Sequence, residues 1–430
     1  MRLWRGGAPA IVRDLAEGWG VADLTGSIVI VGAGHAGGSV AANLRQYGWT
    51  GPITIVGDEP LLPYQRPPLS KAWLKGEADS ESLELRPEHF YSEHGIEVRL
   101  GHSVGAIDRR DRQVLLTGGG SIAYDHLILA TGARARDLPI PGAGLDGVKV
   151  LRTAADADGL KAALGIDKRL VVIGGGYIGL EVAASGRALG AKVVVIEREH
   201  RVLARVACET LSRFFEDYHR RRGVVFELDT GTEAIEGENG AVTGVRLTDG
   251  RLLACDAVLV GIGGLPNVEL AHTAGLICDG GVVVDLEGRT SDPAIFAIGD
   301  VTKRPTPLYD RMFRLESVPN ALEQAKQVAA ALCGRPAPAA ETPWFWSDQY
   351  DVKLQIAGLP FDVSEVVIRG DPAEAKFAAF HLTADGRVQA VEAVNMPDAF
   401  LGGRQLIGAR KQVAPDKLRD MSIPMKAVAL

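Results

Sequence analysis

Cysteine is scarce in this sequence, which has 430 residues and only four thiols: Cys208, Cys255, Cys278 and Cys333. No two of them form a CxxC motif or another close pair, and the first 207 residues contain none. Widely spaced thiols are typical of a reducing compartment, so we expect no disulfide framework and a cytoplasmic protein. The nine histidines show no ligand spacing alongside cysteine, so we predict no protein-bound metal.

Long apolar runs are also missing. No stretch of eighteen apolar residues exists, so the sequence predicts no membrane span. The N-terminal stretch carries Asp14, Glu17 and Asp23 and has no continuous apolar core, so it does not resemble a secretory signal. We expect residues 1–26 to form an extension before the first strand. The net charge of −7 gives no reason to expect nucleic acid or an anionic membrane as a partner.

Glycine, in contrast, is abundant and placed in two similar motifs. The stretches IVIVGAGHAGGSV (Ile28–Val40) and LVVIGGGYIGLEVA (Leu170–Ala183) each read as a strand, a glycine-rich turn and a helix. Both fit the GxGxxG pattern that holds a dinucleotide pyrophosphate at a helix N-terminus. The pattern glycines are Gly32, Gly34 and Gly37 in the first stretch, and Gly174, Gly176 and Gly179 in the second.

An acidic residue follows the second strand of each unit. Glu59 or Asp58 follows ITIVG, and Glu197 follows VVVI. A carboxylate at this place accepts hydrogen bonds from ribose hydroxyls and repels a 2′-phosphate, so Glu197 favours NADH over NADPH. Arg198 and Arg201 stand close by and weaken this preference, because arginine can accept a phosphate.

The motif order predicts an α/β protein with two Rossmann-like dinucleotide-binding domains of the glutathione-reductase-like two-domain type, plus an α+β C-terminal domain. The Pro/Ala-rich stretch Gly334–Pro343 reads as a linker, and the alternation after it predicts antiparallel strands. We also expect the GGGS stretch to form a hairpin or turn between strands at Val114–Leu116 and His126–Ala130. The domains expected are a discontinuous dinucleotide-binding domain (27–147 and 273–337), a second dinucleotide-binding domain (148–272) and a C-terminal domain (338–430).

Several longer motifs resemble one family. The run VGDEPLLPYQRPPLSKAWL is followed by LATGAR, the second glycine motif, FAIGD, SVPNALEQA and PWFWSDQY. This order resembles the FAD-dependent, NADH-linked ferredoxin reductases of bacterial cytochrome P450 and aromatic dioxygenase systems, the putidaredoxin reductase-like family. The resemblance extends from about Ile28 to Pro424, and YQRPPLSK and PWFWSDQY are its most specific parts.

The resemblance implies roles for individual residues. It assigns the first motif to FAD and the second to NAD, and it implies a catalytic set of Lys71, Glu181 and Trp346, with Glu181 facing the nicotinamide and paired to Lys71. The FAD residues implied are Gly32, Gly34, Gly37, Glu59, Arg66, Lys71, Arg134, Asp300 and Trp346. The NAD residues implied are Gly174, Gly176, Tyr177, Ile178, Gly179, Glu181, Glu197 and Gly263. We further expect Glu181 to lie in the first turn of its helix, where the helix N-terminus stabilises a carboxylate.

The identity of the electron acceptor depends on what is absent near the first motif. A disulfide reductase uses a cysteine pair beside the flavin, usually early in the chain, and PYQRPPLSK contains no cysteine. This absence leaves a one-electron acceptor, oxygen or a quinone-like small molecule. The resemblance favours a [2Fe–2S] ferredoxin, which we expect to dock near Arg311, in a stretch that also carries Lys303, Arg304 and Arg314, and near the basic C-terminal segment Arg404–Lys426. Two alternatives stay open: an NADH oxidase or small-molecule reductase, and a flavin redox sensor resembling apoptosis-inducing factor. The protein is expected to be a monomer or weak homodimer.

Overall fold

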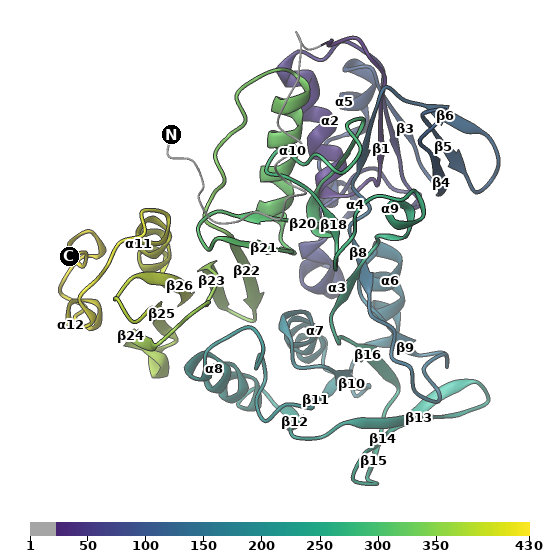
Figure 1. Ribbon diagram of the computed structural model, residues 1–430. Coiled ribbons are helices and arrows are strands. Elements are labelled where there is room, and N and C mark those ends of the chain that lie inside the picture. The colour runs from purple at the N-terminus through teal and green to yellow at the C-terminus, as the bar shows by residue number, and fades with distance from the viewer. Residues whose placement is uncertain (1–22) are drawn as a thin grey trace. The chain divides into compact units, whose positions relative to one another are not determined.

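The computed structural model describes residues 23–430, so most of the expected N-terminal extension lies outside the described residues. Two compact units are each assembled from three chain segments (Figure 1). Unit 1 comprises residues 23–65, 83–133 and 266–343, and unit 2 comprises residues 66–82, 134–265 and 344–430. Among the described residues, no helix is long and apolar enough to cross a membrane.

A five-stranded parallel sheet forms the centre of unit 1, with the strand order β19-β7-β1-β2-β3. Chain order runs outward from β1 in one direction and then resumes on its other side, so the sheet has a topological switch point between β1 and β7. The strands are β1 (Ile28–Val31), β2 (Ile53–Val56), β3 (Ile96–Arg99), β7 (His126–Leu129) and β19 (Ile295–Ala297).

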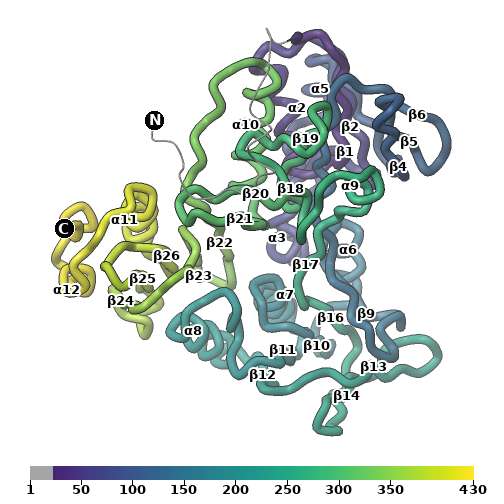
Figure 2. Tube along the Cα trace, in the orientation of Figure 1, coloured from purple at the N-terminus to yellow at the C-terminus, as the bar shows by residue number. Residues whose placement is uncertain are grey.

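Alternate residues of β1 supply two separate cores, as the two-residue period of a strand requires. Ile28 and Ile30 pack with helices α2 (His35–Tyr47) and α10 (Val318–Leu332), which lie side by side (Figures 1 and 2). Val29 and Val31 pack on the opposite face, which smaller elements cover. The remaining elements of unit 1 are α5 (Glu88–Glu93), β4 (Val104–Asp108), β5 (Gln113–Leu116), β6 (Ser121–Ala123), α9 (Glu269–Thr273), β18 (Val282–Val283), η2 (Gly299–Val301), β20 (Thr302–Thr306) and β21 (Arg311–Phe313).

Unit 2 repeats the parallel architecture with the strand order β12-β11-β10-β16-β9, and its switch point lies between β10 and β16. Leu170 and Val172 pack with helices of one face, and Val171 and Ile173 pack with the antiparallel sheet β13-β14-β15 on the other. The strands are β9 (Val148–Lys149), β10 (Arg169–Ile173), β11 (Lys192–Ile196), β12 (Val224–Glu227), β13 (Thr232–Glu238), β14 (Ala241–Leu247), β15 (Leu252–Ala254) and β16 (Ala257–Val260). The helices are η1 (Pro67–Ser70), α3 (Ala72–Lys75), α6 (Ala154–Ala163), α7 (Tyr177–Ala188) and α8 (Glu209–Arg220).

The C-terminal part of unit 2 is an antiparallel sheet with the order β22-β23-β26-β25-β24, accompanied by two α-helices and two 3-10 helices, of which the first is η3 (Pro372–Glu374). Its residues Val352, Leu354 and Phe377 belong to the same hydrophobic core as Phe214 and Phe215 of α8. The elements are β22 (Trp344–Gln349), β23 (Val352–Gly358), β24 (Glu365–Asp371), β25 (Lys376–Leu382), β26 (Val388–Val394), α11 (Pro397–Gly408), α12 (Pro415–Arg419) and η4 (Met425–Ala427). The fold class predicted from the sequence is therefore confirmed, while the exact domain boundaries stay a prediction.

One local expectation is wrong. The GGGS turn joins β5 to β6, and these strands form a small antiparallel sheet with β4. The segment at His126 instead enters the parallel sheet beside β1 as β7. The sequence pattern does not predict β6 (Ser121–Ala123), because three residues are too few to show a strand period. The next apolar run, at His126, therefore looks like the second strand of the hairpin.

His219 is a buried titratable residue that joins α8 to β22. Its Nε2 lies 2.8 Å from Gln349 Oε1, and its Nδ1 lies 3.3 Å from the Tyr350 hydroxyl. The neutral ring satisfies both contacts when Nε2 carries the proton. Burial lowers the pKa of His219 to about 4, and the nearby Arg222 adds to this effect.

This environment makes the stability depend on pH. The unfolded chain takes up a proton on His219 below about pH 6.5, whereas the folded protein does so only near pH 4, so the contribution of His219 is complete above pH 6.5 and is lost as the pH falls toward 4. Between pH 7 and 5 the free energy of unfolding should fall by about 2 kcal/mol more in wild type than in H219Q. Urea titrations measure this difference. The variant H272Q, at an exposed histidine of α9, should behave like wild type, and equal losses in wild type and H219Q would contradict the assignment.

Candidate cofactor and active site

The first glycine turn lies at the switch point of unit 1, and its three pattern glycines differ in what surrounds them. A Cβ at Gly32, where φ is +116°, would lie 2.2 Å from the Ala130 carbonyl oxygen at the end of β7. A Cβ at Gly37 would lie 1.9 Å from the Gly32 carbonyl oxygen, so only glycine allows α2 to start this close to β1. Gly34, the N-cap of α2, faces open space instead. Packing therefore explains Gly32 and Gly37, and room for a pyrophosphate at the helix N-terminus explains Gly34.

The second turn repeats this geometry at the switch point of unit 2. A Cβ at Gly174 would lie 2.5 Å from the Gly261 carbonyl oxygen, next to β16, and one at Gly179 would lie 2.2 Å from the Gly174 carbonyl oxygen. Gly176, the N-cap of α7, again faces open space. Both turns thus fit a dinucleotide on the same structural grounds.

Glu59 and Glu197 lie beyond the ends of the second strands, as the sequence predicts. Glu59 Oε2 accepts a 2.6 Å hydrogen bond from the Tyr64 hydroxyl. Glu197 Oε2 accepts a 2.8 Å hydrogen bond from the Gly175 amide in the glycine turn, and its Oε1 accepts one of 3.1 Å from the Glu199 amide. These bonds hold the Glu197 carboxylate beside the turn on which a dinucleotide would lie.

The two arginines near Glu197 have different roles. Arg201 donates through Nη1 to the Ala207 carbonyl at 3.0 Å and to Ser212 Oγ at 2.5 Å, and through Nη2 to the Ala204 carbonyl at 3.0 Å. Its guanidinium therefore holds the loop before α8 together. Arg198 is exposed and forms an ion pair with Glu199 at 3.6 Å.

Asp300 lies in the short helix η2, directly after β19, and a hydrogen-bonded network holds this turn. Gln324 Oε1 accepts from the Gly299 amide at 3.2 Å and from Thr302 Oγ1 at 3.0 Å, and its Nε2 donates to Asn320 Oδ1 at 3.0 Å. A Cβ at Gly299 would lie 3.2 Å from Ala36 Cβ in α2, so the Asp300 turn lies against the start of that helix.

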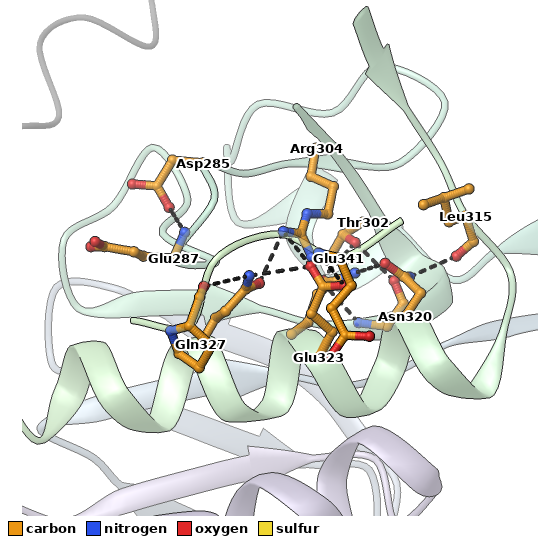
Figure 3. A network of polar contacts seen from close by, with 12 residues as sticks. Asp285, Glu287, Thr302, Arg304, Leu315, Asn320, Glu323, Gln327 and Glu341 are labelled. Atoms are coloured by element: carbon orange, nitrogen blue, oxygen red, sulfur yellow. Dashed lines mark hydrogen bonds and ion pairs between the residues drawn. The ribbon is translucent and has the colours of Figure 1, made fainter. Parts of the chain in front are cut away.

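The same helix, α10, contacts the buried guanidinium of Arg304 through Glu323 and Gln327 (Figure 3). Arg304 Nη2 lies 2.9 Å from Gln327 Oε1 and 3.3 Å from Glu323 Oε1, and the arginine is only 3% exposed. Burial lowers the pKa of Arg304 and raises the pKa of Glu323. Arg304 is therefore an interior residue and cannot contribute to a basic docking surface, which corrects the sequence-based expectation.

Glu181 is the central buried carboxylate of unit 2. Lys71 Nζ lies 2.7 Å from its Oε2, and Glu181 is 3% exposed. Two hydroxyls complete its surroundings: Ser70 Oγ donates to Oε2 at 2.5 Å and Ser347 Oγ donates to Oε1 at 2.6 Å. Both carboxylate oxygens are thus hydrogen-bonded, which is what a buried charge requires.

The position of Glu181 in its helix differs from the expectation. It is the fifth residue of α7, one residue beyond the first turn, which contains no acidic residue. Side chains from η1, the following residue Lys71 and β22 stabilise it in place of the orphan amides of the helix N-terminus. Ser70 and Ser347 are site residues that sequence reasoning missed.

The other expected site residues lie on several elements of unit 2. Arg66 Nη1 donates to the Arg152 carbonyl at 2.6 Å, Arg134 is exposed in β8 (Ala133–Ala135), and Trp346 is half-buried on β22 beside Trp344. Tyr177 begins α7 and packs edge-on against Phe345 at 4.9 Å between ring centroids. Ile178 and Gly263 are exposed, and the Gly263 carbonyl accepts from the Arg136 amide at 2.9 Å.

Known proteins share this architecture. Residues 26–325 match the family model described as pyridine nucleotide-disulphide oxidoreductase, and residues 344–429 match the model described as reductase C-terminal. The chain is 53% identical to a probable ferredoxin reductase of Castellaniella defragrans, over 94% of this chain and 98% of the relative. It is 44% identical to the putidaredoxin reductase of Pseudomonas putida, over 94% and 96% of the two chains. The crystal structure of a covalent putidaredoxin reductase–putidaredoxin complex matches with a TM-score of 0.91 at 44% identity, covering 94% of this chain and 98% of that chain.

The glycine geometry predicts that substitutions at two neighbouring glycines differ greatly in how much they destabilise the protein. G37A should cost several kcal/mol, on the order of 3–5, or prevent folding, because its methyl group would overlap the Gly32 carbonyl. G34A meets no atom within 4 Å and should change the free energy of unfolding by less than about 1 kcal/mol. Urea titration of flavin-free samples measures both. A G37A protein as stable as wild type would show that α2 can move away from β1.

Proposed function

We propose, from the premise that this chain belongs to the pyridine nucleotide-disulphide oxidoreductase family and, within it, to the FAD-dependent ferredoxin reductases, that it passes electrons from NADH to a [2Fe–2S] ferredoxin. The observation that carries this proposal is the buried Glu181–Lys71 pair directly after the second glycine turn. The chemistry that FAD would supply here is acceptance of a hydride from NADH and release of the two electrons one at a time. The chain itself supplies binding, orientation and electrostatics.

Each unit contains residues that we propose for FAD binding. In unit 1, Gly34 would leave room for the pyrophosphate, Glu59 would accept from the ribose, and Asp300, whose turn lies against α2, would bind the ribityl chain. In unit 2, the proposed flavin contacts are Arg66, Lys71, Arg134 and Trp346. The domain boundaries expected from the sequence accompany this proposal: FAD binding by 27–147 and 273–337, NAD binding by 148–272, and a C-terminal domain at 338–430.

We assign Glu181 and Lys71 to the side of the site where the nicotinamide lies. A charged pair with both carboxylate oxygens hydrogen-bonded is rigid, so it can orient the nicotinamide ring without reorganising. Lys71 Nζ also donates to the Pro67 carbonyl at 3.1 Å, which fixes the ammonium group from a second direction. The remaining NAD contacts proposed are Gly174, Gly176, Tyr177, Ile178, Gly179, Glu197 and Gly263.

NADH is the proposed reductant because a carboxylate, Glu197, lies beside the second glycine turn and the neighbouring Arg201 is hydrogen-bonded within the chain. Glu197 presents its carboxylate beside the glycine turn, where it would accept from the adenosine ribose and repel a 2′-phosphate. Arg201 could otherwise bind that phosphate, but its guanidinium already donates three hydrogen bonds within the chain.

E197Q tests this proposal. The variant keeps an acceptor for the Gly175 amide but loses the charge, and hydrogen bonds to charged groups are worth about 1.5–3 kcal/mol. The kcat/KM for NADH should therefore fall about tenfold to a hundredfold, while that for NADPH stays equal or rises. Steady-state ferricyanide reduction measures both. E199Q is the matched control, two residues away, and should leave both values close to wild type; an unchanged NADH value in E197Q would refute the role of Glu197.

A ferredoxin is the proposed acceptor for two reasons. All four cysteines lie in the described chain as free thiols, and none is in PYQRPPLSK (residues 63–71), the early segment where a disulfide reductase would carry its cysteine pair, so a relay through such a pair has no candidates there. Exposed cations could bind an acidic partner: Arg311 in unit 1 and, on the C-terminal segment, Arg410, Lys411, Lys417, Arg419 and Lys426. Arg419 also forms ion pairs with Glu365 and Asp416. Lys303 and Arg314 form ion pairs with Asp279 and Glu316.

R311E should weaken ferredoxin docking while leaving hydride transfer intact. NADH-driven cytochrome c reduction should rise strongly when a small [2Fe–2S] ferredoxin is added to wild type. In R311E the KM for ferredoxin should increase about tenfold at low salt, because reversing one interfacial charge slows association. NADH–ferricyanide turnover should not change. R110E, at an exposed turn between β4 and β5, is the control. Equal loss of both activities in R311E would remove Arg311 from the docking surface, and no response of wild type to any ferredoxin would overturn the proposed function.

A further inference from the structure

Three side chains with metal-ligating atoms meet in unit 2, and two of them, Cys208 and Glu392, lie close enough to Tyr177 to help raise the pKa of its hydroxyl, after the larger effect of burial. They are Cys208, the N-cap residue of α8, His381 on β25 and Glu392 on β26. Their ligand atoms all lie within 4.8 Å of one another. The strand register explains part of this arrangement: His381 pairs with Ala390 and Glu392 pairs with Ala379, so the two side chains are diagonal neighbours on one face of the sheet.

The hydrogen bonding of the cluster is incomplete. His381 is 4% exposed and Glu392 is 2% exposed. The Glu392 carboxylate accepts from the Cys208 amide at 3.1 and 3.2 Å, which caps α8. His381 Nε2 has no hydrogen-bond partner and lies 3.5 Å from Glu392 Oε1, beyond a good hydrogen bond. A buried imidazole nitrogen without a partner is costly, so it calls for an explanation.

We propose that Cys208, His381 and Glu392 form a binding site for Zn²⁺, with a water molecule as the fourth ligand. Zinc takes thiolate sulfur, imidazole nitrogen and carboxylate oxygen together, and bond lengths of about 2.0–2.3 Å place neighbouring tetrahedral ligands about 3.3–3.6 Å apart. The separation between His381 Nε2 and Glu392 Oε1 already has this value. The thiol has to approach by about 1.2–1.5 Å at most, which is the difference between the 4.8 Å limit of the cluster and the ligand separation in the same zinc geometry.

The charges of the site fit a divalent cation. The Cys208 thiol loses its proton to solvent as the S–Zn bond forms, and the thiolate and the Glu392 carboxylate together balance the two charges of the metal. The helix N-terminus disfavours a cation by itself, and the two anionic ligands offset this effect.

The site would join two parts of unit 2. Cys208 starts α8 beside the parallel sheet, whereas His381 and Glu392 belong to the C-terminal sheet. The adjoining contact is apolar, with Phe214 of α8 edge-on to Phe377 of β25 at 5.1 Å between ring centroids. A metal bound here cross-links these segments and stabilises the native state without taking part in hydride transfer.

Cobalt titration of the untagged, FAD-loaded full chain tests the proposal. After dialysis against a chelator, stoichiometric Co²⁺ should produce the d–d absorption of a tetrahedral site at the red end of the visible spectrum, beyond the flavin bands. Added Zn²⁺ should abolish this absorption and raise the Tm. C208S, H381Q and E392Q should each lose at least about a hundredfold in metal affinity, since even outer-sphere partners account for tenfold to a hundredfold.

The controls keep the result interpretable. C278S removes a half-buried thiol elsewhere and should bind Co²⁺ like wild type. E392Q keeps an acceptor for the Cys208 amide, so it remains folded even if another variant does not. No d–d absorption in wild type with excess Co²⁺, or an absorption that persists in both C208S and E392Q, would overturn the proposal. Because NADH–ferricyanide turnover of the metal-free protein should match that of the metal-loaded protein, this result is independent of the proposed reductase function.

Discussion

The close approach of a helix to the strand before it is the constraint on which the rest of the structure depends. At Gly37 and Gly179 a methyl group would lie about 2 Å from the carbonyl oxygen of the first pattern glycine, at 1.9 and 2.2 Å. This contact fixes where α2 and α7 begin, and it places both helix N-termini at the switch points of the two parallel sheets. Unpaired amide groups and open space at Gly34 and Gly176 then occur together, so packing itself creates the two phosphate-binding positions.

Around these positions the structure fixes carboxylates by hydrogen bonds from the chain. Glu197 accepts from backbone amides, Glu59 accepts from the Tyr64 hydroxyl, and Glu181 accepts from two serines and a lysine. Each carboxylate is oriented before a ligand arrives, so binding costs little further ordering. Asn320 and Gln324 do the same for the Asp300 turn, through amides that bridge α10 and η2.

Much of this was predictable because it is local in sequence. The strands Ile28–Val31, Ile53–Val56 and Lys192–Ile196 lie where the motifs predict strands, since each is a mainly apolar run that ends directly before glycine or glutamate. The partners of Glu181 were not predictable from pattern alone. Ser70 and Ser347 lie 111 and 166 residues away in the chain, and single serines have no periodicity. The prediction that Arg304 belongs to a basic surface was wrong for a related reason. Arg304 lies in a short polar strand whose alternate residues are buried, so a residue that looks like a surface cation in the sequence is an interior one.

The cluster of Cys208, His381 and Glu392 could not be predicted from the sequence either, because its members lie far apart in the chain. Comparison with Arg304 shows how this cluster differs from an ordinary buried ion pair. Both Arg304 and His381 keep one buried nitrogen without a hydrogen bond. A guanidinium has five N–H groups and no lone pair to offer, so its contacts with Glu323 and Gln327 satisfy the charge and leave Nη1 without a hydrogen bond. The imidazole of His381 can present a lone pair at Nε2, which lies close to a thiol and a carboxylate that can also ligate a metal. A proton on Nε2 would satisfy the carboxylate alone, whereas a divalent cation would satisfy all three groups at once.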